Sequence, residues 1–166
     1  ASTYGSGIWE VDLYDASKNP PFSNFNCKKT TICQGESANW NSLTTYDAED
    51  IQWQFEGGTP STSTKETQQV IYSEAGEFSI TLISKNENGI DTLTKQNVIE
   101  VLPREITITE NLNLDGTTVL TATSGFDFYL WNTGDTISTI TVENPGWYNL
   151  IAFNDKKCIG RDSFFV

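Results

Sequence analysis

The sequence predicts an all-β protein made of two small antiparallel β-sandwiches in tandem, preceded by an extended N-terminal segment. Apolar and polar residues alternate with a period of two, as in residues 77–84, where Phe78, Ile80 and Leu82 share one face of a predicted strand. Turn signals such as NENG, LDG and NPGW recur along the chain. No window keeps an apolar helical stripe for three turns, so the crossover helices that parallel sheets need are lacking.

Pro103 divides the predicted strands into two sets. Residues 25–102 form one complete series and residues 104–166 a second, and each has the size of a small sandwich. Only a few residues separate the sets, and no Gly/Ser-rich or Pro-rich run lies between them. We therefore expect the two modules to contact each other rather than to move freely.

Residues 1–24 fit neither set of strands. Trp9, Val11 and Leu13 alternate with acidic residues, which predicts one amphipathic strand that ends at the Pro20-Pro21 break. This strand would lie at the edge of one sandwich, or it would be the tail of an upstream domain. We favour the tail.

Charge and composition exclude several classes of function. The chain has 10 basic and 22 acidic side chains, a formal net charge of −12, which repels nucleic acid and anionic lipid surfaces. Its longest apolar run, LIAF at 150–153, is far too short to cross a bilayer. Histidine is absent, which removes the usual general base and the commonest zinc ligand. A two-carboxylate glycoside hydrolase stays open as an alternative, but solvated surface carboxylates are the simpler interpretation.

The three cysteines indicate an oxidising compartment. Cys27 and Cys33 lie close together in NCKKTTICQG, a spacing that a tight loop closes with a disulfide. Cys158 is left over, either as a buried small apolar side chain or as the partner of a cysteine elsewhere. We predict a Cys27–Cys33 disulfide and a free Cys158.

The first series of strands resembles a known family. The segments ICQGESANW, IQWQFEGGTPSTST and QQVIYSEAGEFSITLISKNENGIDTLTKQNVIEV carry a Trp-x-Phe strand, a Gly-Gly-Thr-Pro turn, a Tyr-x-x-Ala-Gly-x-Phe corner and an Asn-Gly-x-Asp-Thr hairpin in order. From Cys33 to Val101 this resembles the PKD family of extracellular β-sandwich modules, in the version common in secreted multidomain proteins of Bacteroidetes. The resemblance implies a secreted or cell-surface bacterial protein, and places Trp53 and Phe55 on the central core strand.

The second series is similar to the short immunoglobulin-like repeats that accompany PKD modules in the same bacterial proteins. It carries Trp-x-x-Gly-x-Thr, Pro-Gly-x-Tyr and a late cysteine in FYLWNTGDTISTITVENPGWYNLIAFNDKKCIGRDSFFV. The resemblance makes Trp131 and Tyr148 the core aromatic residues, and Cys158 lies where that pattern often has a cysteine.

Alternation in the second series predicts an apolar outer face. If Trp131 and Leu150 face the core, their neighbours along the same two strands turn outward. The resemblance to an immunoglobulin-like sandwich implies that these two strands lie side by side in one sheet. These are the ligand-contact candidates: Phe128, Leu130, Trp147, Ile151 and Phe153. Either residues 1–24 or the first module cover this patch, the simpler alternative, or it is open to a glycan or a neighbouring module, with Trp147 as the anchor.

A calcium site is a separate hypothesis. The loop TTYDAED gathers Asp47, Glu49 and Asp50, and hard oxygen donors suit Ca²⁺; some relatives of PKD modules bind it. The glycine at the bend and the terminal bidentate Glu of a full calcium loop are missing, so ordinary surface carboxylates are the competing interpretation. We expect no other cofactor.

Together these patterns predict a noncatalytic accessory region of a secreted or cell-surface bacterial multidomain protein. The family resemblance implies that the parent protein is a hydrolase such as a metallopeptidase. The region would act as a spacer and as a protein- or glycan-contacting adhesion module. Its partners would be proteins or polysaccharides at the cell surface, or neighbouring modules of the same polypeptide. We expect a monomer. A dedicated carbohydrate-binding module is the first alternative, and a carboxylate-based glycoside hydrolase the second.

Overall fold

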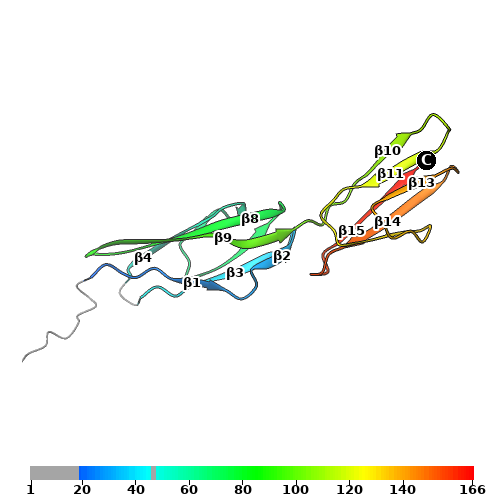
Figure 1. Ribbon diagram of the computed structural model, residues 1–166. Helices are drawn as coiled ribbons and strands as arrows, with labels where there is room; N and C mark the ends of the chain where they lie inside the picture. Colours follow the sequence, from blue (N-terminus) through cyan, green and yellow to red (C-terminus); the bar gives the residue numbers. More distant parts are fainter. Residues whose placement is uncertain (1–18, 46–47) are drawn as a thin grey trace, which may run out of the picture.

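Fifteen β-strands form the described part of the protein. The computed structural model describes residues 19–45 and 48–166, and these residues contain strands, turns and loops but no helix (Figure 1). The strands pair in four sheets, two formed by β1–β9 and two by β10–β15. We call these sets the first and second module; they follow each other end to end, with the second tilted relative to the first (Figure 1). The predicted all-β class is confirmed.

The first module has a four-stranded and a five-stranded sheet. The smaller sheet contains, in spatial order, β1 (Phe25–Cys27), β3 (Ser37–Ser42), β7 (Thr67–Tyr72) and β5 (Gly58–Thr59). The larger contains β2 (Thr31–Cys33), β9 (Gly89–Leu102), β8 (Gly76–Asn86), β4 (Asp50–Phe55) and β6 (Thr62–Ser63). One pair, β2 with β9, is parallel. No crossover helix is needed for it, because the rest of the module is the connection between these strands.

The second module has two three-stranded sheets. One contains β10 (Ile108–Leu112), β11 (Thr118–Ala122) and β13 (Thr139–Val142). The other contains β12 (Phe128–Trp131), β14 (Trp147–Phe153) and β15 (Ile159–Phe165). All pairs are antiparallel, and β14 is the central strand of its sheet.

Aromatic side chains fill the core of the first module. Trp53 is fully buried and stacks on Phe55, with ring centroids 5.3 Å apart. Phe25 packs edge-on against both Trp53 and Trp40. The indole Nε1 of Trp53 donates a hydrogen bond to the Lys65 carbonyl (2.8 Å), so its one polar atom is satisfied inside the core. The central role predicted for the Trp-x-Phe strand is confirmed.

The turn after this strand requires glycine. Gly57 has φ +64°, in the left-handed region, and a Cβ there would overlap the Phe78 ring. The Gly-Gly stretch therefore lets the chain turn while the Phe78 ring stays packed over it.

Residues just before β1 belong structurally to the first module. Ser23 is buried; its backbone N–H donates to Asp91 Oδ2 (2.7 Å), and its hydroxyl shares a hydrogen bond with the Ser84 hydroxyl (2.6 Å). Our sequence analysis placed this stretch in the N-terminal extension. The strand predicted around Trp9 lies outside the described residues.

The core of the second module is centred on Trp131. Its side chain is 2% exposed, and Nε1 donates to the Ile137 carbonyl (2.9 Å). Leu120 and Leu150 pack in the same cluster. Tyr148, expected in the core, packs against this cluster with its ring half-buried. The prediction of one buried tryptophan at the centre of each module is confirmed.

Replacing Trp53 or Trp131 with Ala tests whether each module depends on its own core. We expect a loss of about 3–5 kcal/mol of unfolding free energy in the module concerned, because the change opens a large cavity and removes the buried indole. Chemical denaturation followed by circular dichroism measures it. A loss below about 1 kcal/mol at either position would contradict the assignment of that tryptophan to the core.

Candidate functional site: the module junction and an exposed apolar sheet face

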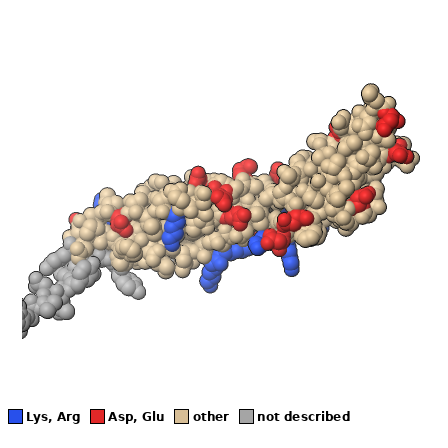
Figure 2. All heavy atoms as spheres, viewed as in Figure 1, with Lys and Arg blue, Asp and Glu red and all other residues tan. Residues whose placement is uncertain are grey.

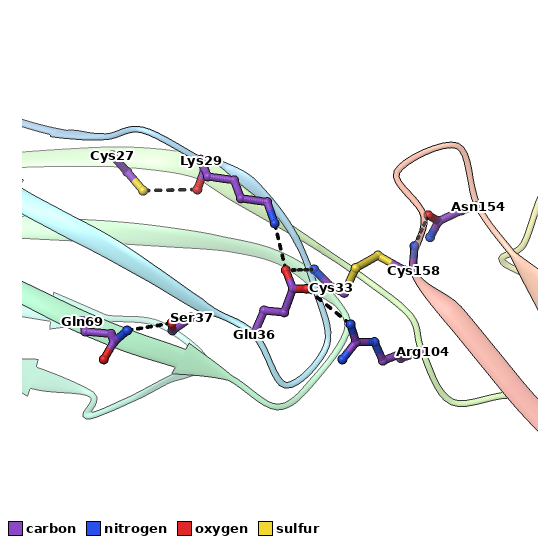
Figure 3. A network of polar contacts seen from close by, with 9 residues as sticks. All are labelled: Cys27, Lys29, Cys33, Glu36, Ser37, Gln69, Arg104, Asn154 and Cys158. Atoms are coloured by element: carbon purple, nitrogen blue, oxygen red, sulfur yellow. Dashed lines mark hydrogen bonds and ion pairs between the residues drawn. A yellow bond between two sulfur atoms is a disulfide. The ribbon is translucent and has the colours of Figure 1, made fainter.

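A disulfide joins the two modules. Cys33 is the last residue of β2 in the first module, and Cys158 lies in the turn before β15 in the second. Their sulfurs are bonded, with the Cα atoms 5.5 Å apart and a sequence separation of 125 (Figure 3). Cys158 is fully buried and Cys33 is 5% exposed, so neighbouring groups shield the bond from solvent.

The predicted Cys27–Cys33 disulfide was therefore wrong. Cys27 ends β1 and Cys33 ends β2, and these strands belong to opposite sheets of the first module. The thiol of Cys27 is free; it packs against the first core and donates to the Lys29 carbonyl (3.2 Å, Figure 3). Sequence proximity does not make two cysteines neighbours when the chain crosses between sheets.

Glu36 organises polar contacts on the first-module side of the junction (Figure 3). One oxygen, Oε2, accepts from Lys29 Nζ (2.9 Å) and from the Cys33 backbone N–H (3.2 Å). The other, Oε1, pairs with Arg104 Nη2 (3.3 Å), which belongs to the connection between the modules. The hydrogen bond from Lys29, followed by that from the Cys33 N–H, lowers the pKa of Glu36 below its usual value.

On the second-module side, the turn that carries Cys158 is closed by Asn154. The Asn154 Oδ1 accepts from the backbone N–H groups of Lys156 (3.1 Å) and Cys158 (3.0 Å). Gly160 lies immediately after this turn, and a Cβ there would stand 2.8 Å from the Arg104 carbonyl oxygen. The connection thus packs directly on the start of β15, and glycine makes that approach possible.

The sheet β12–β14–β15 carries an apolar outer face. Cross-strand register places Phe128 beside Phe153 and Leu130 beside Ile151, while Trp147 lies at the far end of β14. Their exposed fractions are 53% and 38% for the first pair, 47% and 37% for the second, and 62% for Trp147. The structure brings all five predicted contact candidates together. Neither the first module nor residues 19–24 cover them.

Sequence reasoning missed the β15 part of this face. Ile159 and Phe165 are also exposed and lie beside Phe153 and Trp147 in the register. Alternation in IGRDSFF would have shown that they share one side of a strand, had that strand been placed next to β14. The only charged side chain on this face is Arg161, for which the structure shows no ion pair within the described residues.

The aromatic rings on this face occur in two pairs. Phe128 and Phe153 stack at 5.0 Å with 20° between their planes, and Trp147 meets Phe165 at 5.4 Å and 65°. Because Phe128 and Phe153 stand on neighbouring strands, each covers one face of the other and they present mainly edges to solvent. This arrangement provides packing surface rather than a row of flat, open ring faces.

The proposed calcium loop is only partly described, because Asp47 lies outside the described residues. Glu49 and Asp50 are exposed at the start of β4, on the rim of an open hollow of about 1010 Å³ that Glu66 and Lys85 also line. Among the residues that the structure describes, no three acidic, histidine or cysteine side chains are grouped to hold a metal. The nearby ammonium of Lys85 also opposes a cation, so calcium stays an untested hypothesis.

The same hollow is the place to look for a two-carboxylate active site. Glu49, Asp50 and Glu66 are all solvent-exposed there. The two carboxylates of a glycoside hydrolase flank the scissile bond in a cleft that encloses the sugar. The side chains here lie on an open rim, so the geometry does not favour that alternative.

Thiol chemistry checks the disulfide directly. We expect one titratable thiol, Cys27, in the unfolded and unreduced protein, because the other two cysteines are bonded to each other. Digestion without reductant should give a linked peptide pair that contains Cys33 and Cys158. A linked Cys27–Cys33 peptide would restore the sequence-based pairing.

Trp147→Ala tests whether the apolar face is open. With Trp147 62% exposed, we expect the unfolding free energy to change by less than about 1 kcal/mol, because little buried area is lost. Trp131→Ala, in the same module but buried, is the matched comparison. If Trp147→Ala destabilised the module as strongly, some other part of the chain would have to cover the face.

One family model and several solved structures are similar to this chain. A model of the PKD domain matches residues 18–101. Among solved structures, the chain is similar to an I-band fragment of titin, with 16% identity, a TM-score of 0.47 and coverage of 88% of this chain and 64% of that chain. It is also similar to a Dscam structure, with 15% identity, a TM-score of 0.43 and coverage of 89% of this chain and 45% of that chain. A third similar structure is a two-domain fibronectin type-III segment of chicken tenascin, with 9% identity, a TM-score of 0.41 and coverage of 89% of this chain and 99% of that chain.

The chain thus spans less than two thirds of the titin and Dscam structures. No curated protein matches its sequence significantly. The described residues, 19–45 and 48–166, contain no helix that is long and apolar enough to cross a membrane.

The PKD model covers just over half of the sequence, and the strands that it covers form the first sandwich. The chain therefore belongs to the PKD domain family.

Proposed function

We propose that this region is a noncatalytic accessory part of a secreted or cell-surface bacterial multidomain protein, where it serves as a stiff spacer and a contact module. The observation that carries the proposal is the junction. A buried disulfide, an ion pair and a closely packed connection fix two sandwiches end to end. A disulfide of this kind persists in an oxidising compartment, which supports a location outside the cytoplasm.

A spacer holds its ends at a fixed distance only if its two modules do not move relative to each other. The default for two domains joined by a short connection is relative movement unless the interface is large and apolar. Here the disulfide replaces a large interface, because it crosses the boundary at a second point besides the chain itself. Two attachment points restrict bending and twisting that one connection would allow.

The apolar face of β12–β14–β15 supports contact with a protein. Apolar patches that stay exposed commonly mark interaction sites, and aromatic side chains with arginine are typical of their energetic centres. Arg161 lies beside Ile151 on this face, and the face carries no carboxylate. A partner surface with apolar side chains and one acidic group would complement it.

Self-association through this face is disfavoured, which supports a monomer. Two copies docked face to face would leave Arg161 of each without a carboxylate. The net charge of −12 adds repulsion between copies. In the view of Figure 2, the far end of the second module shows acidic but no basic side chains.

A dedicated glycan-binding surface is the second candidate, because Trp147 is exposed and the neighbouring Asn149 and Ser163 side chains are exposed on the same face. Stacked Phe128 and Phe153 rings weigh against it, since sugars bind to open ring faces. Retention of the wild-type protein in polysaccharide gels, lost in Trp147→Ala, would favour the glycan over the protein partner.

NMR relaxation tests the stiff spacer. We expect both modules to share one overall correlation time, because the junction makes them tumble together. Replacing both junction cysteines, Cys33→Ser with Cys158→Ser, should shorten the correlation time of each module by uncoupling them, whereas Cys27→Ser should change nothing. Independent tumbling of the two modules in the oxidised wild-type protein would reject the spacer.

A further inference from the structure

The junction disulfide closes a covalent loop that contains about three quarters of the chain. The loop runs from Cys33 to Cys158, and its sequence separation is 125. Of the buried residues of the first core, only Phe25 and Ile32 lie outside it. All buried residues of the second core lie inside, from Ile106 to Ala152, while the partly buried Phe164 and Val166 that pack on that core lie outside. The connection between the modules, which includes Arg104, is also enclosed.

We propose that this region carries mechanical tension between its two ends, and that the Cys33–Cys158 bond is the load path. A force that enters before Cys33 and leaves after Cys158 passes through the sulfur–sulfur bond. The enclosed backbone between these cysteines is then bypassed, because covalent bonds resist extension while noncovalent packing yields. The connection and the enclosed part of both cores therefore stay unloaded, whereas Phe25 and Ile32 of the first core and the whole of β15 lie on the loaded segments.

The position of the disulfide distinguishes this arrangement from ordinary stabilisation. A bond within one module, such as the predicted Cys27–Cys33 pair, would leave the second module and the connection under load. A bond from the end of β2 to the start of β15 protects both modules with one cross-link. Burial of both cysteines shields the bond from reductants, so the load path persists while the protein is folded.

The loaded segments at the two ends are held by strand pairing. On the first module, β2 pairs in parallel with the last residues of β9, and the Gln34 N–H donates to the Leu102 carbonyl (2.9 Å) just beyond it. On the second, β15 pairs along its whole length with β14. Asp162 of β15 also accepts from the Ile108 N–H through Oδ2 (2.8 Å), which ties the strand to the opposite sheet.

Single-molecule pulling through handles at the two ends of the full chain tests the proposal. Of the described residues, only 19–32 and 159–166 can be released in the oxidised wild-type protein, about 80 Å of contour length at about 3.6 Å per residue. In the Cys33→Ser/Cys158→Ser variant the enclosed residues are released as well, about 450 Å more, so the total of about 530 Å is more than six times the oxidised value. Cys27→Ser is the matched control and should behave like the wild-type protein.

A second pulling geometry keeps the test decisive if the double variant fails to fold. Handles at Leu43 and Leu114, exposed positions in the first and the second module, pull on the loop from inside. The shorter covalent path between them runs through the disulfide and contains residues 33–43 and 114–158, so both modules must unfold before it is taut. About 190 Å should then be released in the oxidised wild-type protein, more than twice the end-to-end value. End-to-end pulling that releases as much as this, or as much as the double variant, would overturn the proposal.

The pulling experiment tests load bearing and the NMR relaxation experiment tests the stiff spacer, and each proposal can fail without the other. Shared tumbling with full extension under load would reject load bearing and leave the spacer intact. Independent tumbling with a short extension would reject the spacer and leave the load path intact.

Discussion

The covalent bond between Cys33 and Cys158 is the constraint on which the rest of the structure depends. In the chain-entropy model, closing a loop of this length restricts the unfolded chain enough to stabilise the folded state by about 5 kcal/mol. Because the loop contains parts of both sandwiches, that stabilisation is shared. Unfolding of either module must take place while its ends stay tied to the other, so the bond couples two cores that have no common apolar cluster.

The same bond sets the orientation of the apolar face. Cys158 lies in the turn between β14 and β15, and both strands of that hairpin carry exposed apolar residues on their outer side. Anchoring the turn to the first module fixes the hairpin at its near end, where Phe153 and Ile159 lie. The face therefore extends from the junction toward Trp147 in a direction set by the first module, so a partner would meet it in one fixed orientation.

Local patterns were sufficient to predict the strands and their inward and outward sides. Trp53, Phe55 and Trp131 were identified as core residues because alternation within a single strand decides which face a side chain takes. The exposed side chains on β12 and β14 followed from the same rule. What local patterns could not supply was the neighbour of each strand. The disulfide was mispaired, and Phe165 was missed, because both depend on contacts between segments that are far apart in sequence.

Charge explains how an open apolar face can persist on such a chain. Contact between two copies through this face would bring together molecules that each carry a net charge of −12. Long-range repulsion is screened at physiological ionic strength beyond about 8 Å, so it acts mainly when surfaces come close. At that distance the unpaired Arg161 side chains also lack a carboxylate on the other copy. A partner that provides this carboxylate together with an apolar surface would bury the face without either cost, which is why we propose a different protein and not a second copy as its occupant.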